Sequence, residues 1–188
     1  ILVGTMTPEE GDLRPQLLDR FALSVEVHGI SDAPERMEIV ERHIGYESDP
    51  EDFRHEWEPA EQVLANKILA ARGLVNDVRF TRRDLYTIAS LTSNLKIDGH
   101  RADLVILKAA RAHAAFEGRT SINQQDILMA LERAIPHRLK RGPFADAMMN
   151  MGELENQLDQ AMSEWGEGDD VELDEQGQEQ AVKKKVPR

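Results

Sequence analysis

Three consecutive segments between Val78 and Pro136 repeat their apolar residues at the helical period, and each begins with a polar starting sequence. The starts are Thr81, Asp98 and Asn123, and the second segment ends at Glu117-Gly118. An oxygen-bearing side chain at a helix start accepts backbone N–H groups that have no partner within the helix. Three short amphipathic helices joined by short loops pack most readily as a bundle. This stretch therefore predicts a mainly α-helical fold.

The composition agrees with such a core and excludes several classes of function. Of 188 residues, 40% are hydrophobic but only 5% aromatic, which suits a core of Ala, Leu and Ile. The formal net charge of −12 argues against nucleic-acid binding, since DNA and RNA attract basic surfaces. No apolar run approaches the roughly 20 residues that span a bilayer. The absence of cysteine excludes disulfides and fits a reducing compartment, so we expect no membrane partner and a cytoplasmic localisation.

The first 28 residues predict a small α/β part. Ile1–Met6 is a short apolar run typical of a buried strand, and Ala22–His28 alternates apolar and polar residues as a half-buried strand does. A short helix is expected between them, over Leu13–Phe21, with Leu17 and Leu18 facing inward. Because the sequence begins inside a strand pattern without an initiator Met, we expect the chain to be the later part of something larger.

Two further helices are expected after these strands, and another is expected near the end of the sequence. Asp32 and Asp49 precede helical patterns that run to Gly45 and Gly73, the second interrupted by Pro59, which should break or bend it. A further amphipathic helix is expected to reach Trp165. Its apolar residues fall at steps of four and three: Ala147, Met151, Leu154, Leu158, Ala161 and Trp165. Such a face either packs on its own chain or docks on a partner subunit. The acidic, then basic, remainder is typical of a disordered tail or linker.

Three ordered motifs are similar to those of the AAA+ ATPase subunits of magnesium chelatase. They are GTMTPEEGDLRPQLLDRF followed by SVEV, then DGHRAD leading into AARAHAAFEGRT, and finally HRLKRGPF. The resemblance covers most of Ile1–Phe144. It implies the last two strands of a P-loop core followed by a three-helix lid, in a subunit that assembles into a ring.

The resemblance also implies a division of the chain into five parts. Residues 1–48 would end the core, 49–77 would connect, and 78–141 would form the lid. An extra amphipathic helix over 142–165 and a disordered acidic tail over 166–188 would follow. The acids between Glu164 and Glu179 resemble the linker of D-type or fused subunits, whereas an I-type subunit usually stops soon after the basic run, and both assignments stay open.

Three positions match functional residues of that family. Thr7 stands at sensor 1, where Asn is usual, and has a shorter reach for orienting water or touching the γ-phosphate. Arg20 matches the arginine finger, an arginine that one subunit presents to the nucleotide of its neighbour. Arg101 matches sensor 2, at a helix start suited to phosphate oxygens. Asp19 and Arg14 are expected at the subunit interface.

Each assignment has a plainer alternative. Arg20 could pair with Asp19, and Arg101 could pair with Asp98 or Asp103, on a solvated face. Arg14 could equally be a solvated arginine at a helix start.

Other candidate residues carry weaker signals. Glu9 and Glu10 are adjacent acids of a kind usually found solvated. The six histidines, including His100 and His113, lack metal-ligand spacing, so no metal site is expected. The basic run Arg138–Arg141 is explained by the attraction of cations to a helix C-terminus.

The sequence contains no GxxxxGK[ST] motif, so residues upstream would have to complete an ATP and Mg²⁺ site. The fragment alone should therefore be inactive. The resemblance implies an ATPase component of a magnesium or cobalt chelatase. That component would work in a ring with other chelatase subunits and drive metal insertion into a tetrapyrrole, a step of porphyrin and chlorophyll biosynthesis. The alternatives are a chaperone-like AAA+ ATPase that remodels a partner protein, and a ring scaffold that supplies only Arg20.

Overall fold

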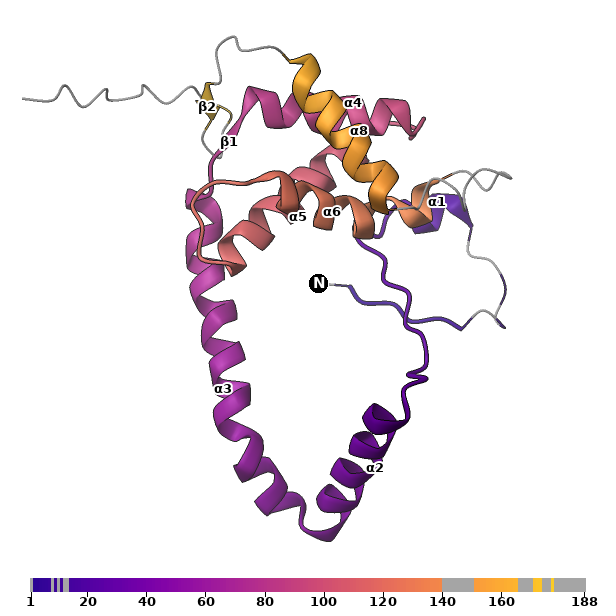
Figure 1. Cartoon of the computed structure of the whole chain (residues 1–188), viewed down its shortest axis with the longest axis vertical. Coiled ribbons are helices and arrows are strands. Elements are labelled where there is room, and N and C mark those ends of the chain that lie inside the picture. The colour runs from indigo at the N-terminus through magenta and orange to yellow at the C-terminus, as the bar shows by residue number, and fades with distance from the viewer. Residues whose placement is uncertain are drawn as a thin grey trace, which may run out of the picture.

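The computed structural model describes residues 2–7, 9, 11, 14–139, 151–165, 171–173 and 177. A helical bundle lies at one end of the molecule (Figure 1). One long helix extends from it and meets a second long helix at the far end, so that the two form the arms of a V, and extended chain links the second arm back to the bundle. The first described residues run as extended chain between these arms. The mainly helical fold with a small strand content confirms the predicted class.

The arms are α2 (Ala33–Ser48) and α3 (Pro50–Leu74). Both begin as predicted: the Asp32 carboxylate accepts from the backbone N–H of Glu35, and Asp49 accepts from those of Glu51 and Asp52. Pro59 lies inside α3 without ending it, so of the two predicted effects, a break or a bend, the break does not occur. The carbonyl that loses its bond to Pro59 lies on an exposed helix, where water can replace the missing donor.

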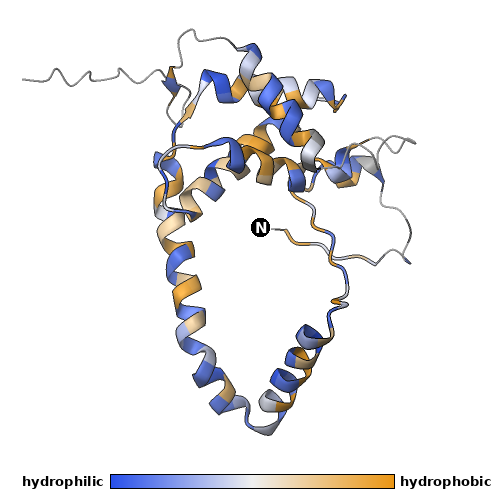
Figure 2. Ribbon diagram, viewed as in Figure 1, coloured by the Kyte–Doolittle hydropathy of each residue, from blue (hydrophilic) through white to orange (hydrophobic). Residues whose placement is uncertain are grey.

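No residue of either arm is buried, although both carry apolar side chains (Figure 2). Where the arms meet, Phe53 packs edge-on against Tyr46 with ring centroids 5.8 Å apart, and it also contacts Trp57. Large apolar side chains along the arms stay in water: Met37, Ile39, Val40, Ile44, Val63, Leu64, Ile68 and Leu69.

The two predicted N-terminal strands are not formed. Residues 2–7 and 23–30 are extended but belong to no strand among the described residues, and Val3 and Val25 are 81% and 69% exposed. A strand is stabilised by hydrogen bonds to a neighbouring strand and by burial of one face, and the described chain supplies neither. Between them, α1 (Pro15–Leu18) is a single turn, with Leu17 46% exposed rather than inward-facing.

The bundle consists of α4 (Arg82–Asn94), α5 (Arg101–Phe116) and α6 (Gln124–Ala134), preceded by η2 (Val75–Asp77) and followed by η3 (Pro136–Arg138). Thr81 and Asn123 form capping boxes with Asp84 and Asp126, which confirms these two predicted starts. The start predicted at Asp98 is not confirmed, because α5 begins only after His100, whose side chain makes no cap bond. The side chains buried most completely share one core: Val78, Ile88, Leu91, Ile106, Ile127, Leu131 and Leu158.

The last helix, α8 (Met151–Glu164), packs on this bundle against α4 and α6. Leu154, Leu158 and Ala161 are buried, and the ring of Trp165 lies 5.0 Å from that of Tyr86. Of the two roles left open for this face, the structure shows packing on its own chain. Ala147 and the rest of 142–150 lie outside the described residues.

One part of the predicted tail is ordered. β2 (Glu172–Leu173) pairs antiparallel with β1 (Phe80–Thr81), and Leu173 is 4% exposed. Arg79 donates to the Glu172 carboxylate at 2.5 Å. The assignment of 166–188 to disorder is therefore wrong at these residues, because Leu173 finds an apolar site and Glu172 a cation. Among the described helices, none combines the length and apolarity needed to cross a membrane.

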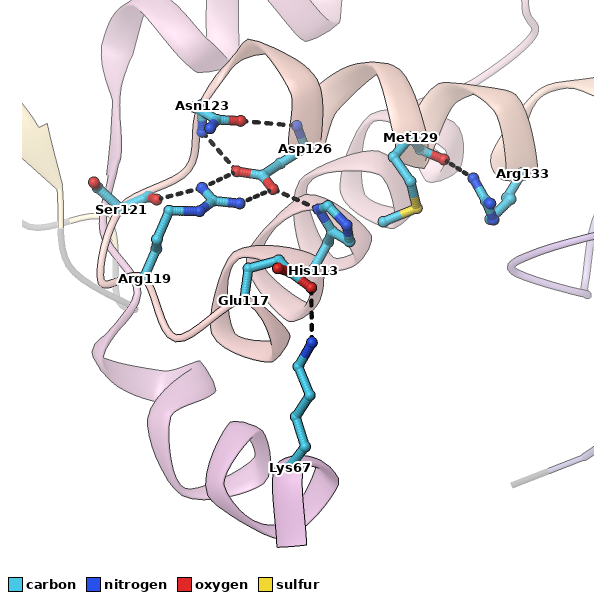
Figure 3. A network of polar contacts seen from close by, with 9 residues as sticks. All are labelled: Lys67, His113, Glu117, Arg119, Ser121, Asn123, Asp126, Met129 and Arg133. Carbon is cyan, nitrogen blue, oxygen red and sulfur yellow. Dashed lines mark hydrogen bonds and ion pairs between the residues drawn. The ribbon is translucent and has the colours of Figure 1, made fainter. Parts of the chain in front are cut away.

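A buried carboxylate joins the ends of α5 and α6 (Figure 3). Asp126 is 0% exposed and accepts from Arg119 Nη1 at 2.6 Å and Nη2 at 2.5 Å. It also contacts His113 Nδ1 at 2.6 Å and accepts from the Asn123 backbone N–H at 2.7 Å. Burial alone would raise the pKa of Asp126, but these bonds outweigh it and the pKa lies below its usual 3.8.

We expect Asp126→Asn to destabilise the protein by on the order of 3 kcal/mol, at the low end for a broken buried pair. The lower figure applies because Arg119, 33% exposed, keeps access to water. Denaturant unfolding of both proteins at neutral pH measures the difference. Glu132→Gln, which alters an ion pair with the adjacent Arg133, is the control and should change stability little.

The same comparison has a pH signature. A carboxyl with a lowered folded-state pKa stabilises above its unfolded pKa of 3.8, and that stabilisation is lost as pH falls through the folded value. The difference between wild type and Asp126→Asn should therefore be constant near neutrality and shrink only in acid below 3.8. A difference that shrinks near pH 6 would contradict this account.

Candidate functional site

A shallow pocket lies where α5 begins beside the turn that follows α1. Its lining residues are Arg20, Ala22, Arg101, Leu104, Val105 and Lys108. The four from α5 are spaced three, one and three residues apart, so they lie on one helical face. Three of the six lining side chains are cations. This arrangement suits an anionic group, because the N-terminus of α5 adds exposed N–H donors and the positive end of a helix dipole.

Asp19 connects the pocket to the rest of the bundle. Its Oδ2 accepts from Arg101 Nη1 at 3.2 Å, and its Oδ1 accepts from Arg138 Nε at 3.3 Å. The Asp19 backbone carbonyl accepts from the same two arginines, each at 3.3 Å. Asp19 thus pairs with two arginines at the same end of the bundle, where α5 begins and α6 ends, rather than with its neighbour Arg20.

The Arg20 side chain is exposed and makes no hydrogen bond or ion pair within the described part of the chain. Its backbone is held by the turn, since Arg20 N–H donates to Leu17 O at 3.0 Å and Phe21 N–H donates to Leu18 O at 3.0 Å. The structure therefore presents a solvated guanidinium on a fixed backbone. Such a group can donate to an oxyanion on another molecule without first giving up an internal partner.

The residues that hold this turn come from η3. Arg138, with 3% of its side chain exposed, donates to Phe21 O at 2.9 Å and to Ala22 O at 3.0 Å. His137 Nε2 lies 3.0 Å from Phe21 O. Because a carbonyl only accepts, His137 must carry its proton on Nε2.

Burial shifts the pKa of both η3 residues downward. For Arg138, burial outweighs the opposing effect of Asp19. For His137, burial outweighs the raising effect of the bond to Phe21 O, and the nearby Arg138 lowers its pKa further. His137 is therefore neutral at pH 7.

The other predicted residues lie elsewhere. Thr7 is exposed in the extended segment 2–7 and is not among the residues that line the pocket. The backbone carbonyl of Arg14 accepts from Leu17 and Leu18 N–H and so starts α1. Glu9 is exposed, and Glu10, Lys140 and Arg141 lie outside the described residues. No group of acids and histidines in the described chain could hold a metal ion.

Sequence reasoning missed Lys108, His137 and Arg138. The spacing of Arg101 and Lys108 on one helical face could have indicated Lys108. Arg138 was assigned to a helix C-terminus, and it does donate to Ala134 O in the last turn of α6. Its contacts with residues 19–22 span more than 110 positions and leave no local pattern in the sequence.

Comparison with known proteins finds similarity over the bundle and over most of the chain. Residues 85–157 match the family model described as "AAA lid domain". The chain is 44% identical over 147 residues to the magnesium-chelatase 38 kDa subunit of Rhodobacter capsulatus, covering 78% of this chain and 42% of that protein. It is 40% identical over 160 residues to a magnesium-chelatase subunit ChlI homolog of Methanocaldococcus jannaschii, covering 85% of this chain and 44% of the homolog.

A third relative is an uncharacterized protein of Mycobacterium tuberculosis, 44% identical over 158 residues. That match covers 84% of this chain but 25% of the relative. The chain thus spans less than half the length of each of these relatives.

The neutrality of His137 predicts a loss of stability in weak acid. The unfolded histidine binds a proton near pH 6.5, whereas the folded one binds it only at lower pH, so stability falls as pH drops through 6.5. His137→Gln keeps a donor but cannot ionise. We expect the melting temperature of wild type to fall more than that of His137→Gln between roughly pH 7.5 and 5.5. Parallel pH profiles for the two proteins would show that His137 does not titrate in this range.

Proposed function

We propose that this chain, the C-terminal AAA+ portion of a magnesium-chelatase-type subunit, supplies two arginines to the ATP bound by a neighbouring subunit. The observation that carries the proposal is the pocket shared by Arg20 and Arg101. Arg20 would act as the arginine finger and Arg101 as sensor 2. Because both line one pocket, both would act on the same nucleotide, and a finger by definition reaches the neighbour's.

The chemistry is electrostatic. Negative charge develops on the phosphoryl oxygens during transfer, and a preorganised guanidinium stabilises it. Arg20 has no internal partner to exchange within the described chain, so its full hydrogen-bonding capacity is available. Arg101, held by Asp19 at 3.2 Å, would orient phosphate oxygens at the start of α5, and Lys108 would add a third cation.

ATP is the cofactor that this set of groups fits, because the pocket offers three cations and one helix N-terminus to a polyphosphate. Bound ATP would supply the phosphoryl group whose transfer drives the motor. The described residues include no group of acids and histidines that could hold a metal ion, so the ligands of the accompanying Mg²⁺ would come from the remainder of the P-loop core. Thr7 would belong to that core as its sensor 1 residue, with Asp19 and Arg14 at the subunit interface.

The complete subunit would assemble with its copies into a ring and hydrolyse ATP there. Together with other chelatase subunits, the ring would drive insertion of magnesium or cobalt into a tetrapyrrole in the cytoplasm. The names of two relatives, each about 40% identical, support this role.

The decisive variant is Arg20→Ala in the full-length subunit. We expect ATP binding and ring assembly to persist while the hydrolysis rate falls by about 10³-fold or more, the loss typical of a missing arginine finger. Steady-state ATPase assays with nucleotide titration and size-exclusion chromatography measure these quantities. Arg36→Ala is the control and should leave the rate unchanged, because it removes an exposed arginine of α2 that donates only to Ile30 O, ahead of that helix, among the described residues. Near-normal turnover of Arg20→Ala would refute the proposal.

Mixed rings test whether Arg20 and Arg101 serve one nucleotide. If both act on the neighbour's nucleotide, every interface in a ring of Arg20→Ala and Arg101→Ala subunits lacks one arginine, so mixing restores no activity. If Arg101 instead acts on its own subunit's nucleotide, some interfaces contain both arginines. Recovery of ATPase activity on mixing the two variants would then contradict the shared site.

A further inference from the structure

Arg20 lies within a turn whose backbone is bound by one buried side chain from the end of the lid. We call residues 19–22 the finger turn. Three of its four carbonyl groups, those of Asp19, Phe21 and Ala22, accept hydrogen bonds from the Arg138 guanidinium at 3.3, 2.9 and 3.0 Å. The one carbonyl outside this set belongs to Arg20 itself. Arg138 therefore binds the backbone on both sides of Arg20.

The same guanidinium is tied to the lid. The guanidinium also donates to Ala134 O in the last turn of α6, and the backbone N–H of Arg138 donates to Ile135 O at 2.7 Å. With 3% exposure of its side chain, Arg138 makes these bonds out of contact with water. A buried charged donor with several fixed acceptors resists displacement, because any movement leaves buried groups unpaired.

A simple role in capping α6 does not account for this geometry. A cation that serves only a helix C-terminus can stay exposed and bind the last carbonyls from the surface. Here the side chain is buried and most of its donors point to the finger turn. Asp19 extends the link, because its carboxylate accepts from Arg138 at 3.3 Å and from Arg101 at 3.2 Å.

We propose that Arg138 is a positioning residue that fixes the finger turn on the lid, so that Arg20 and Arg101 keep one relative orientation as the lid moves. This inference rests on the proposed function of Arg20. Arg138 itself touches no nucleotide; it acts by holding the backbone from which Arg20 extends. Its planar, five-donor group is required, because a lysine ammonium at the same place cannot reach acceptors spread around a turn.

The test is Arg138→Lys in the full-length subunit, with Arg138→Gln as a second variant. A displacement of about 1 Å at a reacting group costs up to about 10²-fold in rate, so we expect kcat for ATP hydrolysis to fall by roughly ten- to a hundredfold. The KM for ATP and the assembly of rings should change by less than about threefold, because the substitution affects a contact made in the transition state and leaves the binding of ATP itself unchanged. Lysine should not rescue, although it keeps the charge.

Arg133→Lys is the matched control. Arg133 lies five residues earlier, and within the described part of the chain its side chain bonds only to Met129 O and Glu132 of α6, each at 2.9 Å. It should retain wild-type kcat. Wild-type kcat in Arg138→Lys would overturn the proposal. Failure of both Arg138 variants to fold or form rings would also overturn it, by assigning Arg138 to stability alone.

A double variant separates positioning from a direct role. If Arg138 acts through Arg20, then Arg138→Lys should lower the residual rate of Arg20→Ala by less than about twofold. A further tenfold loss in the double variant would show that Arg138 acts independently and would overturn the inference. The proposed function fails separately, if Arg20→Ala alone hydrolyses ATP normally. Loss of activity in Arg20→Ala with full activity in Arg138→Lys refutes only the positioning role.

Discussion

The relative placement of α5 and α6 depends on the Asp126 carboxylate. Arg101 and Arg138 lie where α5 begins and α6 ends: Arg101 opens α5, and η3 with Arg138 follows α6. Asp126 joins the other ends, where it binds His113 and Arg119 at about 2.6 Å. Because α5 and α6 are rigid and the Asp126 contacts join them at this end, those contacts set the separation of the helices at the other end. There Asp19 bonds to both Arg101 and Arg138.

The site is built at the contact between two chain segments of different character. Residues 19–22 belong to a region with little regular structure, whereas Arg101 and Arg138 belong to a packed bundle. The backbone around the exposed Arg20 is held in place by hydrogen bonds from the buried side chain of Arg138. Exposed side chains that must adopt a reproducible position are typically held by the packing and hydrogen bonds of neighbouring residues. The Asp19 carboxylate accepts hydrogen bonds from Arg101 and Arg138 at the same time.

Local chemistry explains which parts of the fold could be predicted. The starts at Asp32, Asp49, Thr81 and Asn123 are confirmed because a cap is formed by residues within three positions of one another. The strands expected at 1–6 and 22–28 are absent because strand formation needs a partner strand, which the described residues lack. The strand at Leu173 also escaped prediction, since its partner residue Phe80 lies more than 90 positions earlier in the chain. Pro59 is tolerated because α3 is exposed at that point.

The amino-acid sequence alone determined most of the helices, the caps at Asp32, Asp49, Thr81 and Asn123, and the resemblance that singled out Arg20 and Arg101. All of these depend on short-range patterns or on ordered motifs. Only the tertiary structure placed those two arginines in one pocket and turned the α8 face onto its own bundle. It also showed that Arg138, which in the sequence is one member of a basic run, is a buried donor to the carbonyl groups of the finger turn. The physical reason is that an arginine's role depends on which carbonyls and carboxylates surround it, and most of the acceptors around Arg138 lie more than 110 positions earlier in the chain.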